Sequence, residues 1–240
     1  MIELKDCENI IRNVLREGRM VMRADEAKQI CSLHQIPVPI SYTVLNVREA
    51  VLKANEMGYP IVLKVISPQI VHKSDAGGVV LNIRDEKELE TAFGMMAADV
   101  GAKYPSAKVL GILVEKMMPQ STEVIVGAIR DQQFGPSIMF GIGGVFTEIY
   151  NDVAFRVAPI DRVDALNLIQ ELKGVRILEG ARGKPPANID SIVDVLLNVS
   201  SLMMEHESIS QLDLNPVITY AEGVCAVDCR IILRGIEGDT

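Results

Sequence analysis

Three polar side chains near the end of the chain have the types and spacing of a metal site. Asp213 and Asn215 are two residues apart in LDLNPV, so a strand places both on one face. A two-residue hairpin turn at Glu222 and Gly223 brings Asp228 onto the same face, and so does a four-residue loop. Two carboxylates and an amide oxygen are hard ligands of the kind that Mg²⁺ shares with phosphates. The alternative is a chance alignment of exposed polar residues, and the pattern leaves both open.

A lysine on an apolar strand, followed by a glycine pair, suggests a phosphate site. The strand Ile61–Ile66 alternates its apolar residues onto one face, so Lys64 projects from the other. Gly77 and Gly78 end the loop that follows, and they allow backbone N–H groups to approach a ligand closely. The loop matches neither common glycine-rich phosphate motif. A solvated strand lysine beside a plain turn is the alternative.

The same loop, HKSDAGGV, carries a histidine away from any apolar stripe. A neutral imidazole is nucleophilic near pH 7, so His72 could accept a phosphoryl group and pass it on. A solvated loop histidine fits the same pattern. His34 and His206 lie at the ends of helical patterns and are interpreted as structural or surface groups.

Two glutamates interrupt or precede apolar strands. Glu115 in GILVEKM and Glu123 in STEVIVGA could accept hydrogen bonds from an adenine amino group or a ribose hydroxyl. Taken singly, a glutamate at such a position is more often an exposed edge residue. The glycine-rich segments 140–148 and 180–186 could likewise face an anion or form plain turns.

The element pattern predicts an α+β chain of two lobes. Helix and strand alternate up to a seam near Pro105, after which closely spaced strands predict an antiparallel sheet. We therefore expect residues 1–108 to form the N-terminal helices and the first lobe, and 109–240 the second. The expected strands are 42–44, 61–66, 79–83, 110–117, 123–130, 136–140, 152–157, 209–219 and 224–232. The expected helices include 47–57 and 86–103, with further ones before residue 35 and after Asp161 and Asp190.

Composition narrows the class of partner. The 240 residues carry a net charge of −8, the wrong sign for a phosphate-backbone ligand, so nucleic acid is not expected. No apolar run approaches the roughly 18 residues of a membrane span, and the first residues lack a leader pattern. We expect a soluble, cytoplasmic chain without a membrane partner. The four cysteines are expected to be reduced, because a chain of this length does not need disulfides. They are also expected to be structural, because no second pair of metal ligands accompanies Cys225 and Cys229.

These parts, in this order, resemble the ATP-grasp fold, in which two α+β lobes hold a nucleotide between them. The chain is most similar to the β subunits of ADP-forming acetyl-CoA synthetases, or NDP-forming acyl-CoA ligases. HKSDAGGV together with LDLNP is specific for this family. The other matching segments are EAKQICSLHQIPVP, YPIVLKVISP, ILVEKMMP, TEVIVGA, FGIGGVFTEIYNDVAFRVAPI, GARGKPP and AVDCR.

The resemblance implies a role for each candidate residue in binding ADP or ATP with Mg²⁺. Lys64, Glu115 and Glu123 fall where the superfamily contacts the phosphates, adenine and ribose of the nucleotide. Asn215 and Asp228 fall on the Mg²⁺ ligands.

It also implies a phosphohistidine relay. His72 falls on the family's second phosphohistidine and Asp213 on the acidic residue that supports it. A partner α subunit binds CoA, forms an acyl phosphate and passes the phosphoryl group through its own histidine, and the loop with His72 carries it to ADP. The expected assembly is α2β2 or larger.

Two other functions fit an ATP-grasp chain. A stand-alone carboxylate ligase needs acid and nucleophile sites within these residues, and the short second lobe argues against that. A non-catalytic or regulatory nucleotide-binding module does not need His72, Asp213, Asn215 and Asp228 together.

Overall fold

The computed structural model describes residues 2–70, 77–143, 152–180 and 185–235. They form two compact units, which are described separately below. Unit 1 comprises Met1–Val38 and Gln120–Thr240, and unit 2 comprises Pro39–Pro119. Helices and antiparallel strands are mixed in both, which confirms the α+β class.

The elements keep their order along the chain. The helices are α1 (Ile2–Arg16), α2 (Ala24–Leu33), α3 (Val47–Met57), α4 (Glu86–Lys103), α6 (Arg162–Gln170), the 3₁₀ helix η1 (Val175–Glu179) and α7 (Ile189–Glu205). The strands are β1 (Ser41–Val44), β2 (Ile61–Ile66), β3 (Val79–Ile83), β4 (Gly111–Lys116), β5 (Thr122–Asp131), β6 (Gly135–Ile142), β7 (Val153–Val157), β8 (Ile209–Thr219), β9 (Val224–Ala226) and β10 (Cys229–Leu233). None of the helices in the described ranges is long and apolar enough to cross a membrane.

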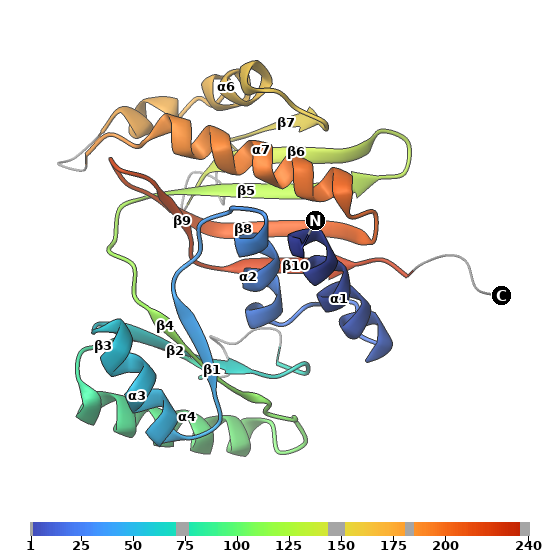
Figure 1. Ribbon diagram of the computed structural model, residues 1–240. Helices are drawn as coiled ribbons and strands as arrows, with labels where there is room; N and C mark the ends of the chain where they lie inside the picture. The colour runs from blue at the N-terminus through green and yellow to red at the C-terminus, as the bar shows by residue number, and fades with distance from the viewer. Residues whose placement is uncertain (1, 71–76, 144–151, 181–184, 236–240) are drawn as a thin grey trace. The chain divides into compact units, whose positions relative to one another are not determined.

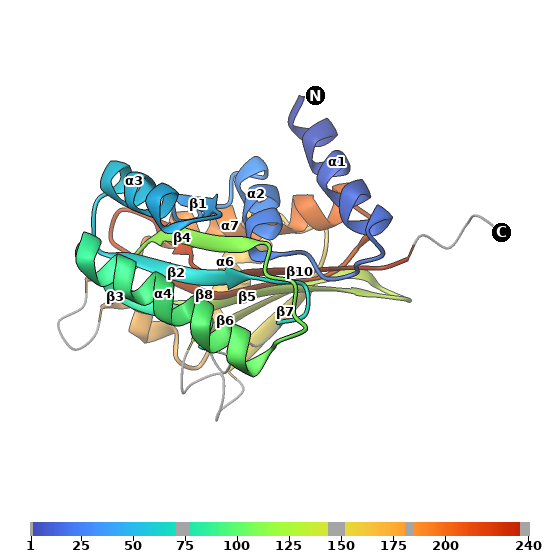
Figure 2. The ribbon, with the colours of Figure 1, turned by 90° about the horizontal axis from the view of Figure 1, so that it is seen from below.

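Unit 2 is a four-stranded antiparallel sheet in the order β1-β4-β2-β3, with α3 and α4 on one face (Figures 1 and 2). Alternation along β2 sends Ile61, Leu63 and Val65 into the core beneath these helices. Lys64 therefore projects from the opposite face, as its position in the strand predicted. In Figure 2, α4 runs along β2 and β3.

Unit 1 is a six-stranded sheet in the order β10-β8-β5-β6-β7, with β9 beside β8. Its core face is covered by α1, α2, α6 and α7, and Figure 1 shows α7 crossing β5 and β6. On β5, Val124, Val126 and Ala128 face the core. Glu123, Ile125 and Gly127 alternate with them onto the opposite face, and this face carries the polar residues of the site below.

The unit boundary corrects the expected division at residue 108. Glu115 of β4 lies opposite Ser41 of β1 and Val62 of β2, so residues 109–119 complete the sheet of unit 2. The N-terminal helices belong to unit 1 because Met22 N–H donates to Ile231 O at 3.0 Å and Leu233 N–H donates to Met20 O at 2.7 Å. Strand pairing between distant segments therefore decided both the boundary of unit 2 and the place of the N-terminal helices.

Most element bounds agree with the sequence pattern. The bounds of α3, α4, β2, β3 and β8 are those expected, and most others differ by one or two residues. The expected strand 224–232 is two strands, because Val227 and Asp228 leave the ladder between β9 and β10. This break lies at the candidate metal site.

Candidate functional site

The polar residues of β8 and β10 converge on the face of the unit 1 sheet that lies opposite the core. Asp213 lies directly opposite Arg230, and Asn215 N–H donates to Asp228 O at 3.2 Å. Leu212 and Leu214, their neighbours in β8, point into the core. Asp213, Asn215, Asp228 and Arg230 are exposed and lie on the opposite side.

The connection between β8 and β9 differs from the expected hairpin. Thr219 pairs with Val224, so a four-residue loop joins the strands and the two-residue turn at Glu222 and Gly223 is wrong. Asp228 still lies beside Asn215, because adding two residues to a hairpin loop preserves which side chains share a face. The convergence of the three candidate ligands is therefore independent of this error.

Like charges meet at this face. Desolvation by the surrounding protein and the nearby Asp228 carboxylate raise the pKa of Asp213, whereas the Arg230 guanidinium lowers it. The two neighbouring carboxylates repel each other, and a hard cation bound between them would relieve this repulsion. With the amide oxygen of Asn215 beside them, these residues fit Mg²⁺. Arg230 is the residue that the sequence reasoning missed. Its spacing of two from Asp228 was a sufficient signal that both lie on one face.

Two glycines, one in β5 and one just after β6, allow other groups to pack closely against them. Gly127 lies opposite Asp213, and a Cβ there would stand 3.1 Å from Met139 Cε. A Cβ on Gly143 would stand 2.9 Å from Glu123 Cβ, and Gly143 N–H donates to Glu123 O at 2.8 Å. The exposed Glu123 is thus held at the start of β5, on the same face as Asp213.

In unit 2, two candidate residues form a buried ion pair. Lys64 Nζ lies 3.0 Å from Glu115 Oε1, and the residues are only 7% and 1% exposed. Lys64 pairs with Leu113 of β4. Glu115 is two residues further along β4 and therefore lies on the same face as Lys64. The sequence reasoning selected both residues but did not predict the pair, because the β2–β4 register is not local information.

The glycine-containing loop is anchored next to Lys64. Val79, which follows the loop, pairs with Lys64, and Val65 N–H donates to Gly78 O at 2.8 Å. Gly77 has φ +70°, a conformation that favours glycine. His72, and the segments 144–148 and 181–184, lie outside the described residues.

Comparisons with known proteins identify the family of this chain. The ATP-grasp domain family matches residues 13–233. The β subunit of acetate–CoA ligase [ADP-forming] I from Pyrococcus furiosus is 45% identical over 97% of this chain and 100% of its own length.

Solved structures of one relative match almost the whole chain. Acetyl-coenzyme A synthetase 1 of Ca. Korarchaeum cryptofilum, in complex with coenzyme A and Ca-AMPCP, has 43% identity and a TM-score of 0.92 over 94% of this chain and 99% of that one. Another structure of that enzyme holds coenzyme A and Mg-AMPPCP, with its phosphohistidine segment pointing towards the nucleotide site. It has 41% identity and a TM-score of 0.84, and covers 95% of this chain and 100% of that one.

Proposed function

The chain belongs to the ATP-grasp family and, within it, to the β subunits of ADP-forming acetate–CoA ligases, and we propose that it is the nucleotide-binding subunit of such an enzyme. The reaction converts acyl-CoA, ADP and phosphate to the free acid, CoA and ATP, and is reversible. The observation that carries this proposal is the convergence of the exposed Asp213, Asn215 and Asp228 on one face of the sheet. The chain that carries them matches such a subunit over 97% of its length.

Asn215 and Asp228 are the residues that would hold Mg²⁺. When bound, the ion offsets negative charge on the nucleotide phosphates. Lys64 contributes a second positive charge to the phosphates, and Glu115 orients the lysine through their ion pair. Gly77 and Gly78 allow backbone N–H groups to approach the nucleotide, and the exposed Glu123 accepts hydrogen bonds from it.

His72 is the phosphoryl carrier in this proposal. Its neutral ring nitrogen attacks phosphorus, so that an N–P bond forms as the bond to the donor breaks. In the second step an oxygen of ADP attacks, the N–P bond breaks and the ring is regenerated. Asp213 positions the imidazole and favours its charged form, as a carboxylate does for a catalytic histidine. The relative whose phosphohistidine segment points towards its nucleotide site supports this assignment.

The enzyme needs a second subunit. The name of the relative, subunit β, supports a CoA-binding α subunit as partner, and we propose an α2β2 or larger assembly in the cytoplasm. The chain alone should bind nucleotide but should not form ATP from acyl-CoA.

Reconstitution tests the proposal. The chain is purified alone and with the CoA-binding subunit from its own cell extract, and ATP formation from acetyl-CoA, ADP and phosphate is measured. Activity confined to the complex supports the subunit assignment. Turnover by the chain alone would favour the stand-alone ligase, and nucleotide binding by an inactive complex would favour a regulatory module.

The carrier is tested in the same complex. With labelled ATP and Mg²⁺, the chain should acquire a phosphate whose bond is labile to acid and stable to base. The His72→Ala complex should lose both the label and turnover, yet bind ADP normally. Phosphate mapped to His34 or His206, or normal turnover by His72→Ala, would contradict the carrier role.

A further inference from the structure

Unit 1 holds a second cluster of metal-binding side chains, built from three helices. Cys7 lies in α1, His34 follows the end of α2, and His206 follows the end of α7. One ligand atom from each lies within 4.8 Å of the other two. None of the three belongs to the nucleotide site proposed above. From the sequence, Cys7 was interpreted as structural and the two histidines as structural or surface groups.

The two imidazoles already meet through the nitrogens that a metal would use. His34 Nε2 and His206 Nε2 are 2.9 Å apart, and the rings pack edge to face with centroids 5.1 Å apart. Two imidazole ligands of a tetrahedral Zn²⁺ lie about 3.3 Å apart, since each Zn–N bond is about 2.0–2.1 Å. The rings therefore need to open by only about 0.4 Å to admit an ion between them.

The cluster is largely shielded from solvent. Cys7 and His206 are 1% and 5% exposed, and His34 is half-buried. Neutral imidazole and thiolate are the forms that bind transition metals.

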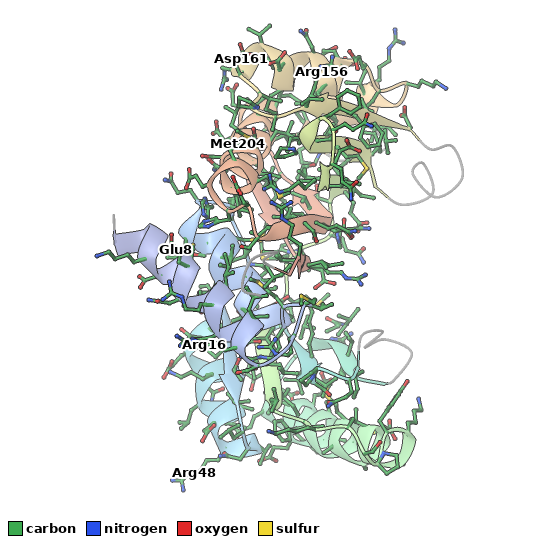
Figure 3. All side chains as sticks on the ribbon, turned by 90° about the vertical axis from the view of Figure 1, so that its right-hand side faces the viewer. Glu8, Arg16, Arg48, Arg156, Asp161 and Met204 are labelled. Atoms are coloured by element: carbon green, nitrogen blue, oxygen red, sulfur yellow. The ribbon has the colours of Figure 1, made fainter. Side chains whose placement is uncertain are left out.

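Charges of both signs lie near the cluster. The last turn of α2 contains no basic residue, and the carbonyl end of this helix lies at His34. Glu8, which is labelled in Figure 3 and follows Cys7 in α1, and Glu205 place carboxylates close to His206. Arg130 acts in the opposite direction, because it donates to His206 O at 3.1 Å.

We propose that Cys7, His34 and His206 bind a Zn²⁺ ion, with water as the fourth ligand. One thiolate and two imidazoles form a ligand set that suits Zn²⁺ and excludes Mg²⁺, which takes oxygen ligands. On binding, the Cys7 thiol loses its proton to solvent and an S–Zn bond forms. The ion ties α1 to the ends of α2 and α7, and so joins the N-terminal helices to the C-terminal half of unit 1.

Cobalt substitution tests the ligand set on the full chain. After dialysis against a chelator, Co²⁺ should produce a thiolate charge-transfer band and the visible bands of a tetrahedral site, and Zn²⁺ should abolish both. Cys7→Ser should remove the charge-transfer band, and His34→Ala should weaken Zn²⁺ binding by more than the roughly 10- to 100-fold that loss of an outer-shell partner costs. Cys225→Ser is the matched control, because this buried thiol lies outside the cluster, and its spectrum should be that of the unchanged chain.

X-ray absorption of the Zn²⁺-loaded, unsubstituted chain covers the case in which a variant fails to fold. One sulfur at about 2.3 Å and two imidazole nitrogens at about 2.0–2.1 Å are expected. Two sulfurs would overturn the proposal in favour of Cys31 and Cys229, whose thiols are hydrogen-bonded neighbours. No Zn²⁺ binding by the folded chain, or a charge-transfer band that survives Cys7→Ser, would also overturn it. These outcomes do not depend on ATP formation.

Discussion

The two units treat their functional charges in opposite ways. In unit 2, Lys64 and Glu115 are buried and neutralise each other at 3.0 Å. In unit 1, Asp213 and Asp228 are exposed carboxylates that repel each other, and Arg230 offsets only part of that repulsion. The buried ion pair has its charges balanced without a ligand, whereas the exposed carboxylates would gain from a bound cation. The two arrangements match the roles proposed for them, a preorganised lysine in unit 2 and a metal site in unit 1.

Breaking the buried pair should produce the largest effect. Glu115→Ala leaves the Lys64 ammonium buried without its carboxylate, and removal of one partner of a buried pair costs about 3–5 kcal/mol. Urea unfolding of the nucleotide-free chain measures this. Lys64→Met with Glu115→Leu should recover most of the stability while nucleotide binding stays weak. A single variant as stable as the unsubstituted chain would show that the pair is not energetically coupled.

Removing a proposed metal ligand from unit 1 should instead spare stability. Asp228→Ala and Asn215→Ala should weaken Mg-nucleotide binding by more than the roughly 10- to 100-fold that loss of an outer-shell partner costs, because each would remove a direct ligand. Their thermal transitions without ligand should hardly change, because both side chains are exposed. Calorimetric titration checks the binding. Glu222→Ala, on the loop after β8, is the control, and equal binding by all three variants would remove the metal assignment.

Desolvation of Asp213 and its repulsion from Asp228 should together appear as a pH dependence of stability. Because the pKa of Asp213 is raised on folding, the folded chain binds more protons than the unfolded chain between the ordinary carboxyl pKa and the raised value. Stability should therefore fall as pH rises through that window and stay lower above it.

Asp213→Asn should remove this loss, so the variant should be slightly more stable than the unsubstituted chain at pH 7. The advantage should disappear below about pH 4, where Asp213 is protonated in both states. Thermal unfolding across pH, with and without Mg²⁺, tests this. A variant less stable at pH 7 would mean that the carboxylate is a net stabilising group. The same variant should bind ADP but transfer phosphate more slowly, because an amide cannot stabilise the charged ring.

Arg230 should have the smallest effect. Arg230→Gln removes a charge that lowers the pKa of Asp213, so that pKa should rise further. NMR titration of the Asp213 carboxyl measures the change, with Arg162→Gln on α6 as a distant control. An unchanged or lower pKa would exclude Arg230 as the partial counter-charge.

Local patterns predicted the elements and the faces of this protein well. The bounds of α4 follow from its helical spacing, and the projection of Lys64 away from Ile61, Leu63 and Val65 follows from alternation in β2. Asp213 and Asn215 share a face for the same reason. These features depend on residues within a few positions of each other, so the sequence contains them directly.

Pairing between distant segments was decided only by the tertiary structure. The β2–β4 register brings Lys64 to Glu115, β4 closes the sheet of unit 2, and the first 38 residues pack on a sheet formed mainly by the second half of the chain. The meeting of Cys7, His34 and His206 likewise requires three helix positions to converge. A register depends on the summed packing of whole strands and helices, which no local spacing encodes. The sequence therefore determined which residues could do chemistry, and the tertiary structure decided which of them meet.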